Sequence, residues 1–252
     1  MVRTSDPGRE ILPLPEQQPG FRLLALRCLT ACIGCVGLAF GFSDLVRGEV
    51  SDDFRDLESR LLQFETFSQP TARQALSSAA AWNVSFCDNH AQRALLLMEI
   101  PLADAALRSG VVHEYDERIR SLEARGRQAL SCTPRDSFVW LVLFGLAAGH
   151  GILNEHAFDL LAMSYETSPN EAWIGSRRTA LAIPVVLSAP EPIRQKILTE
   201  FQSLVRHGFA EMPARSYLHA SGPIRSLLQS QIELLDASSQ KTFSDALQRV
   251  RS

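Results

Sequence analysis

The chain has 252 residues, of which 46% are apolar and 21% are charged, and its formal net charge at pH 7 is −3. A chain of this size and composition can bury one sizeable hydrophobic core or two small ones. The mildly acidic, evenly mixed charge excludes the basic surface that nucleic-acid binding requires. We therefore expect a folded protein that binds no nucleic acid.

The N-terminal part of the chain changes abruptly in character. Residues 1–20 contain prolines and mixed charges without a periodic apolar pattern, and we expect a disordered cytoplasmic tail there. Sixteen uncharged residues then follow one another, Cys28–Ser43. As a helix they cover roughly 24 Å, so a span of the ~30 Å hydrocarbon core has to begin near residue 21, with Arg27 reaching toward the headgroups. We predict a transmembrane helix over 21–43. A buried core helix and a cleaved signal peptide are the alternatives.

The cysteines indicate on which side of the membrane the rest of the chain lies. Arginines near the two ends of the predicted span are equal in number, so the positive-inside rule gives no orientation. Three of the five cysteines (Cys28, Cys32 and Cys35) lie within the span, which leaves Cys87 and Cys132. An even number of cysteines in an exported domain suggests a disulfide, so we predict a Cys87–Cys132 bridge in a periplasmic domain attached to the inner membrane by one span. Two unrelated thiols, in a cytoplasmic domain on an inverted anchor, are the alternative.

Beyond the span, apolar residues recur at helical spacing and strand-like alternation is missing. The predicted helices begin at Ser51 and at Asp88 and cover residues 71–82, 102–130, 138–148, 153–167, 170–187, 191–207, 214–220, 224–235 and 238–251. Pro101 is expected to open the long 102–130 segment, and Gly110 and Gly126 to bend or split it. The fold class is therefore all-α, with a transmembrane helix, an N-terminal helical region over 51–131 and a second helical region over 132–252.

The second region contains a spacing that is typical of stacked helix pairs. Pro134 and Pro169 lie 35 residues apart, and Trp140 and Trp173 lie 33 residues apart. Periods of this length mark helical-hairpin repeats. The second unit keeps little of the pattern besides its tryptophan, so the signal comes mainly from the first.

The first unit reads Trp140-x-x-Leu143, then Gly145, then Ala157-x-x-x-Leu161 and a closing proline. It resembles the tetratricopeptide pattern of Trp-x-x-Leu-Gly, Ala-x-x-x-Phe and Pro, with one additional residue before the glycine and leucine in place of phenylalanine. In such a hairpin we expect Gly145 and Ala157 to let the two helices approach closely.

The stretch ALSCTPRDSFVWLVLFGLAAGHG…FDLLAMSYETSPNEAWIGSRR also resembles a family of periplasmic helical-repeat segments. These accompany bacterial polysaccharide polymerases and exopolysaccharide assembly systems, and combine a membrane anchor with a Ser-Tyr…Pro-Asn-Glu-x-Trp…Arg block. The resemblance implies a scaffolding or accessory role in envelope polysaccharide biosynthesis or export. It also implies a protein partner in the envelope, such as a polymerase or export component, and brings no catalytic residue.

The sequence contains no strong motif for a catalytic or metal-binding site. His150 and His156, with Glu155 beside them, are six residues apart across a glycine turn, whereas zinc on one helix face needs histidines four apart. We expect Asn154 to cap a helix there and no metal to bind. Neither a Gly-x-Ser-x-Gly nor a glycine-rich phosphate loop occurs. We predict no catalytic residue and no cofactor; the alternative is a glycan-acting hydrolase or lyase whose acids the sequence does not identify.

One group of residues is a candidate for partner binding. Tyr165, Trp173 and Arg177 could form a concave patch that grips a peptide or an anionic glycan. The structural alternative is that Arg178 pairs with an acid of the 166–171 segment and holds consecutive helices together.

Overall fold

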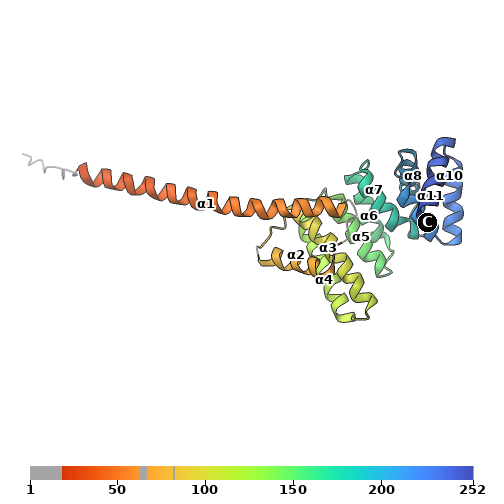
Figure 1. The fold of residues 1–252 in the computed structure, drawn as a ribbon, viewed down its shortest axis with the longest axis horizontal. Helices are drawn as coiled ribbons and strands as arrows, with labels where there is room; N and C mark the ends of the chain where they lie inside the picture. Colours follow the sequence, from red (N-terminus) through yellow and green to blue (C-terminus); the bar gives the residue numbers. More distant parts are fainter. Residues whose placement is uncertain (1–18, 63–66, 82, 252) are drawn as a thin grey trace, which may run out of the picture. The chain divides into compact units, whose positions relative to one another are not determined.

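The structure, a computed structural model, describes residues 19–62, 67–81 and 83–251. These residues form α-helices and one short 3-10 helix, and no strand occurs among them, so the all-α prediction is confirmed. The elements are α1 (Pro19–Leu62), α2 (Gln69–Ala81), α3 (Asn89–Arg108), α4 (Val112–Cys132), α5 (Ser137–Gly149), α6 (Glu155–Thr167), α7 (Ala172–Ala182), η1 (Ile183–Val185), α8 (Glu191–Arg206), α9 (Glu211–His219), α10 (Gly222–Glu233) and α11 (Ala237–Arg251) (Figure 1).

The chain divides into two units, Met1–Val50 and Ser51–Ser252. In the first unit, the described side chains of residues 26–39 are all exposed. No helix among the described residues is both long and apolar enough to cross a membrane, so the transmembrane helix predicted over 21–43 is not supported. Residues 1–18 of the predicted tail and several side chains of 21–43 lie outside the described part of the chain.

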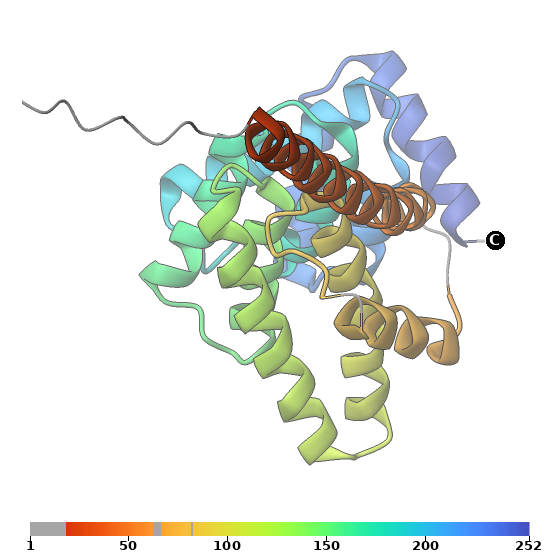
Figure 2. The ribbon, with the colours of Figure 1, turned by 90° about the vertical axis from the view of Figure 1, so that its left-hand side faces the viewer.

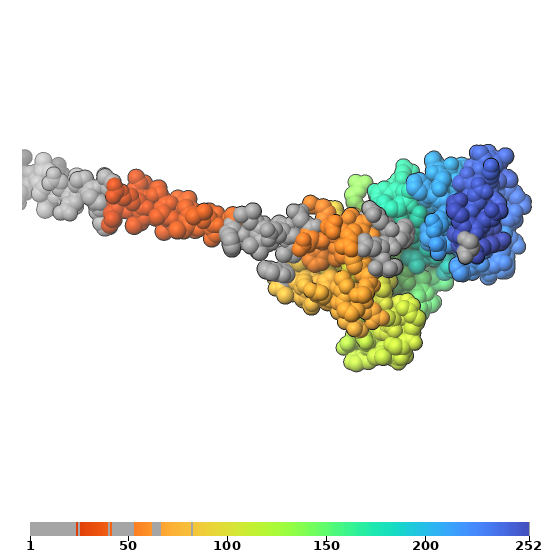
Figure 3. All heavy atoms as spheres, in the orientation of Figure 1, coloured from red at the N-terminus to blue at the C-terminus, as the bar shows by residue number. Residues whose placement is uncertain are grey.

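The second unit begins with pairs of adjacent helices. Helices α3 and α4 lie side by side as a hairpin, whose tip projects from the surface of this unit (Figures 2 and 3). Gly110 makes the turn with φ +73°, a conformation that favours glycine. The prediction that Pro101 opens a helix is wrong, because α3 continues through Pro101 and ends at Arg108. The predicted 102–130 segment is therefore split at Gly110.

A disulfide joins the segment before α3 to the end of α4. Cys87 and Cys132 are bonded, with their Cα atoms 5.1 Å apart, as the cysteine count predicts. The bridge closes a loop across 45 positions of sequence, which on the chain-entropy account stabilises the fold by about 4 kcal/mol. Gly126 does not break α4; a Cβ there would lie 3.0 Å from Leu143, so glycine lets α4 approach α5 closely.

Helices α5 and α6 form the predicted hairpin. Ala157 and Leu161 are buried in its seam, and the rings of Phe144 and Phe158 lie 6.3 Å apart. Gly145 has a different role from the predicted one, because a Cβ at this position would contact Leu181 of α7 rather than α6. The succession of packed helices is consistent with a helical-repeat fold.

Candidate functional site

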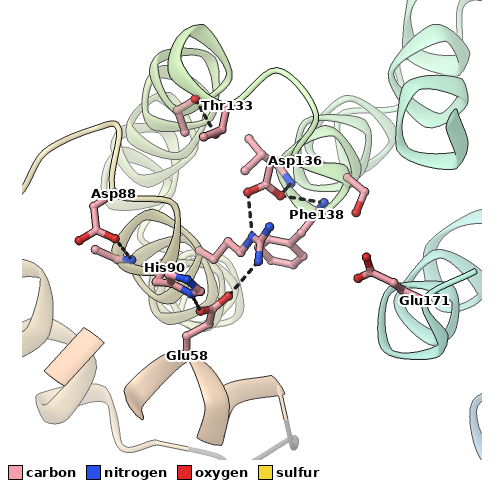
Figure 4. A network of polar contacts seen from close by, with 12 residues as sticks. Glu58, Asp88, His90, Thr133, Asp136, Phe138 and Glu171 are labelled. Atoms are coloured by element: carbon pink, nitrogen blue, oxygen red, sulfur yellow. Dashed lines mark hydrogen bonds and ion pairs between the residues drawn. The ribbon is translucent and has the colours of Figure 1, made fainter. Parts of the chain in front are cut away.

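A network of polar side chains joins the end of α1 to α3 and α5 (Figure 4). The Glu58 side chain is 5% exposed; it accepts a hydrogen bond from Arg93 Nη1 at 3.2 Å and lies 2.5 Å from His90 Nδ1. Arg93 Nε donates to Asp136 Oδ2 at 2.7 Å, and Asp136 Oδ1 accepts hydrogen bonds from backbone N–H groups in the first turn of α5. The network therefore fixes residues 51–62 of α1 against the helices that follow.

The charged side chains of this network form ion pairs with one another. Burial alone would lower the pKa of Arg93, but the carboxylates of Asp136 and Glu58 outweigh it and raise the pKa above its ordinary value. Both carboxylates bind the same guanidinium, so we assign them to the packing of α1 rather than to acid–base chemistry.

Trp173 and Arg177, two of the predicted partner-binding residues, lie four residues apart on one face of α7. The Trp173 ring packs against Phe138 with centroids 6.1 Å apart, and its Nε1 donates to Glu171 Oε2 at 2.7 Å. The Arg177 guanidinium lies 6.0 Å from the centroid of Phe138. Its Nη2 donates to the backbone oxygen of Leu61 at 3.0 Å, a favourable position for a cation at the C-terminal end of a helix. Burial lowers the pKa of Arg177. These contacts are with α1 and α5 of the same chain.

Tyr165, the third predicted residue, has a different partner. It is buried, and the guanidinium of Arg178 lies 4.6 Å from its ring centroid. Arg178 is fully buried and binds Glu200, with its Nε 2.9 Å and its Nη2 2.6 Å from Oε1. It also donates to the backbone oxygens of Ser164 and Ser168 at 2.8 and 2.9 Å. One side chain therefore links α6, α7 and α8.

The sequence indicated this linking role for Arg178 but not its partner. The acids expected to pair with it have other contacts: Glu171 accepts from Trp173, and Glu166 lies 3.8 Å from Lys196. Glu200 is 22 residues away on α8, and no local spacing signals that pairing.

A cavity lies beside this ion pair, between the end of α6, the start of α7 and α8. Its volume is about 780 Å³, within the range of small-molecule sites. Glu200 and Tyr165 line it from the core side, and Glu171, Lys196 and Phe209 line it from more exposed positions. A Cβ at Gly175 would lie 3.0 Å from Glu200 Oε1, so glycine at this position lets the carboxylate lie against α7.

Burial perturbs both ionisable groups on the core side of the cavity. Burial raises the pKa of Glu200, although the hydrogen bonds and charge of Arg178 oppose the shift. The pKa of the Tyr165 hydroxyl is raised well above its ordinary value, first by burial and then by the charge of Glu200. The Tyr165 hydroxyl interacts with the Glu200 carboxylate closely enough to affect its pKa, but it makes no hydrogen bond of ordinary geometry to the described residues. The buried lining of the cavity thus contains a carboxylate paired with Arg178 and a tyrosine hydroxyl group without a hydrogen bond of ordinary geometry.

The histidine cluster of the 150–156 segment has a structural role. Asn154 caps α6 by accepting a hydrogen bond from the N–H of Ala157 at 3.0 Å, as predicted. His156 is exposed, and His150 packs 6.2 Å from the ring of Tyr115. Among the described residues no group of histidine, cysteine or carboxylate side chains is arranged to hold a metal ion.

Comparison with known proteins identifies no relative. No protein-family model matches the chain, and neither a curated protein nor a solved structure is significantly similar to it.

Proposed function

We propose that this protein is a non-catalytic helical scaffold of the bacterial envelope, which binds a component of polysaccharide biosynthesis or export in the cavity between α6, α7 and α8. The observation that carries the proposal is a cavity of about 780 Å³ built on a rigid base. Arg178 holds Glu200 and two backbone oxygens of the α6 end, so the base keeps its shape without a ligand. Stacked helices commonly use such surfaces for binding.

The proposal includes attachment to the inner membrane through the apolar part of α1. Large apolar side chains of this stretch are exposed to solvent, Leu29, Ile33, Val36 and Leu38 among them. Exposed apolar area of this extent in a soluble protein is unfavourable and marks an interaction with lipid or protein. Flotation of the full chain with phospholipid vesicles, compared with a chain that begins at residue 44, tests the attachment. Equal flotation of the two would contradict it.

The disulfide supports a periplasmic location for the helical unit. Cys87 and Cys132 are bonded, and disulfides persist in oxidising compartments such as the periplasm. Alkylation of intact cells followed by non-reducing electrophoresis measures the bond directly. Complete alkylation of both cysteines without a reductant would contradict the periplasmic placement.

The scaffold role is tested by filling the cavity. Thr199 is exposed on α8 and lines the cavity, so Thr199→Arg places a long cationic side chain there. Ser230→Arg, at an exposed position of α10, is the matched control. We expect a deletion strain that carries T199R to secrete less polysaccharide than one that carries S230R, at equal protein levels in immunoblots. Equal secretion by the two strains would refute the role of the cavity.

A glycan-acting hydrolase or lyase is the second candidate, because one observation favours it. Two carboxylates, Glu171 and Glu200, line the cavity, and burial raises the pKa of Glu200 as in a general acid. The bonds from Arg178 to Glu200 argue against this role, since they oppose the rise in the pKa of Glu200. Release of reducing ends from envelope polysaccharide that is lost in Glu200→Gln would establish the enzyme and overturn the scaffold.

A further inference from the structure

We infer that the cavity between α6, α7 and α8 binds a short, neutral oligosaccharide. This inference rests on the proposed function and specifies the ligand of the same site. It is drawn from three features of the cavity: its charge balance, its polar groups that have hydrogen-bonding capacity left for a ligand, and its exposed phenylalanine ring.

The cations around the cavity are paired with carboxylates. Glu200 is neutralised by the buried Arg178, and Lys196 lies 3.8 Å from Glu166 on the rim. Glu171 is exposed to solvent and already accepts a hydrogen bond from Trp173. No uncompensated cation is left among the described lining residues to attract an acidic sugar or a phosphate. A ligand without formal charge is therefore favoured.

Several polar groups in the cavity are available to a ligand. The side chains of Asn170 and Thr199 line it and make no hydrogen bond to the described residues. His207 Nδ1 donates to the backbone oxygen of Ser203 at 2.7 Å, which leaves Nε2 as an acceptor. Amide, hydroxyl and imidazole groups together supply both donors and acceptors. Sugar hydroxyl groups, which donate and accept at once, match this mixture.

The buried hydroxyl group of Tyr165 points to the same chemistry. Tyr165 is 7% exposed and lines the cavity; the Glu200 carboxylate acts on its hydroxyl group, but no described residue makes a hydrogen bond of ordinary geometry with it. A buried hydroxyl group without a partner is unfavourable, and native proteins rarely leave one. A ligand hydroxyl group that reaches the base of the cavity would satisfy it.

An apolar surface completes the site. Phe209 is 52% exposed and lines the cavity, and Leu204 and Pro169 are also part of the lining. The C–H face of a pyranose ring is apolar and stacks on aromatic rings, while its hydroxyl groups project around the rim. An exposed phenylalanine beside uncommitted amide and hydroxyl groups is thus suited to a sugar ring.

Isothermal titration of the full chain with maltotriose, cellotriose and chitotriose tests the inference, beside trigalacturonic acid and the peptide Ser-Asn-Gln-Ser as comparisons. We expect at least one neutral trisaccharide to bind with a dissociation constant of about 1 mM or below. Tyr165→Phe removes only the hydroxyl group and should weaken binding about tenfold. Phe209→Ala should weaken it similarly, whereas Phe86→Ala, which truncates an exposed phenylalanine far along the chain, should not.

The outcomes separate the inference from the function on which it rests. No binding of any neutral trisaccharide at about 10 mM overturns the inference, as does equal binding by Y165F and F209A. Binding of the acidic sugar or the peptide alone also overturns it. If polysaccharide secretion still depends on Thr199 in these cases, the scaffold role stands and only the ligand is wrong. If secretion is unaffected by T199R as well, both proposals fail.

Discussion

Replacing Arg178 with alanine perturbs a buried ion pair of the helical unit. Arg178 is 0% exposed, lies 2.6 Å from Glu200 Oε1, and donates to the backbone oxygens of Ser164 and Ser168. Its removal leaves a largely buried carboxylate and two buried carbonyl groups without their donor. Removing one partner of a buried ion pair costs about 3–5 kcal/mol, so we expect R178A to lower the free energy of unfolding by about that amount.

Equilibrium unfolding in urea, followed by far-ultraviolet circular dichroism with the disulfide intact, measures the loss. Arg215→Ala is the matched control, because Arg215 lies 2.8 Å from Glu211 but these side chains are 52% and 65% exposed. Solvent screens that pair, and its loss should cost less than about 1 kcal/mol. The double variant R178M/E200L removes both buried charges and should be much more stable than R178A. A loss in R178A as small as in R215A, or a double variant as unstable as R178A, would refute the reasoning.

Four further predictions concern stability. Burial raises the pKa of Glu200, so the folded state binds this proton more tightly than the unfolded state does. The resulting contribution to the free energy of unfolding is fully present below the ordinary pKa of 4.5. It is lost as the pH rises through the raised pKa. Urea titrations over a pH series should therefore show a flatter decline above pH 4.5 in Glu200→Gln, and an unchanged slope would contradict the assignment. Replacing Cys87 and Cys132 with serine should lower the free energy of unfolding by about 4 kcal/mol, and dithiothreitol should then have no further effect. Glu58→Ala should cost about 1–3 kcal/mol by leaving partners on α3 unsatisfied, and should increase amide hydrogen exchange over residues 51–62, which an unaffected exchange rate would disprove. Gly110→Ala should cost about 1 kcal/mol, because φ is +73° although the space around it is open; a neutral result in the same urea assay would show that the turn relaxes.

Features set by neighbouring residues are predictable from this sequence. Asp88, Asp136 and Asn154 each precede an apolar periodic segment, and each caps a helix through its side-chain oxygen. The Cys87–Cys132 bond follows from a count, because only two cysteines lie outside the apolar stretch. Such signals span a few residues or a single residue type, so tertiary packing does not obscure them.

Features set by packing between distant segments are not predictable in this way. Arg178 binds Glu200 across 22 residues and Arg93 binds Glu58 across 35, and many carboxylates along the chain were equally eligible. Pro101 was expected to start a helix, yet α3 passes through it because buried residues on both sides of it hold the helix in the core. The helical spacing of Trp173 and Arg177 correctly places them on a common face, but that spacing carries no information about what the face contacts.

Helix α7 connects the two parts of the candidate site. On one face, Trp173 and Arg177 contact α5 and the last turn of α1; on another, Gly175 and Arg178 form the wall and support of the cavity. Glu171, at the N-terminal end of α7, belongs to both, because it lines the cavity and accepts a hydrogen bond from Trp173. This helix of 11 residues is packed on both faces. The contacts of Trp173 and Arg177 and the buried side of the cavity therefore depend on the placement of the same helix.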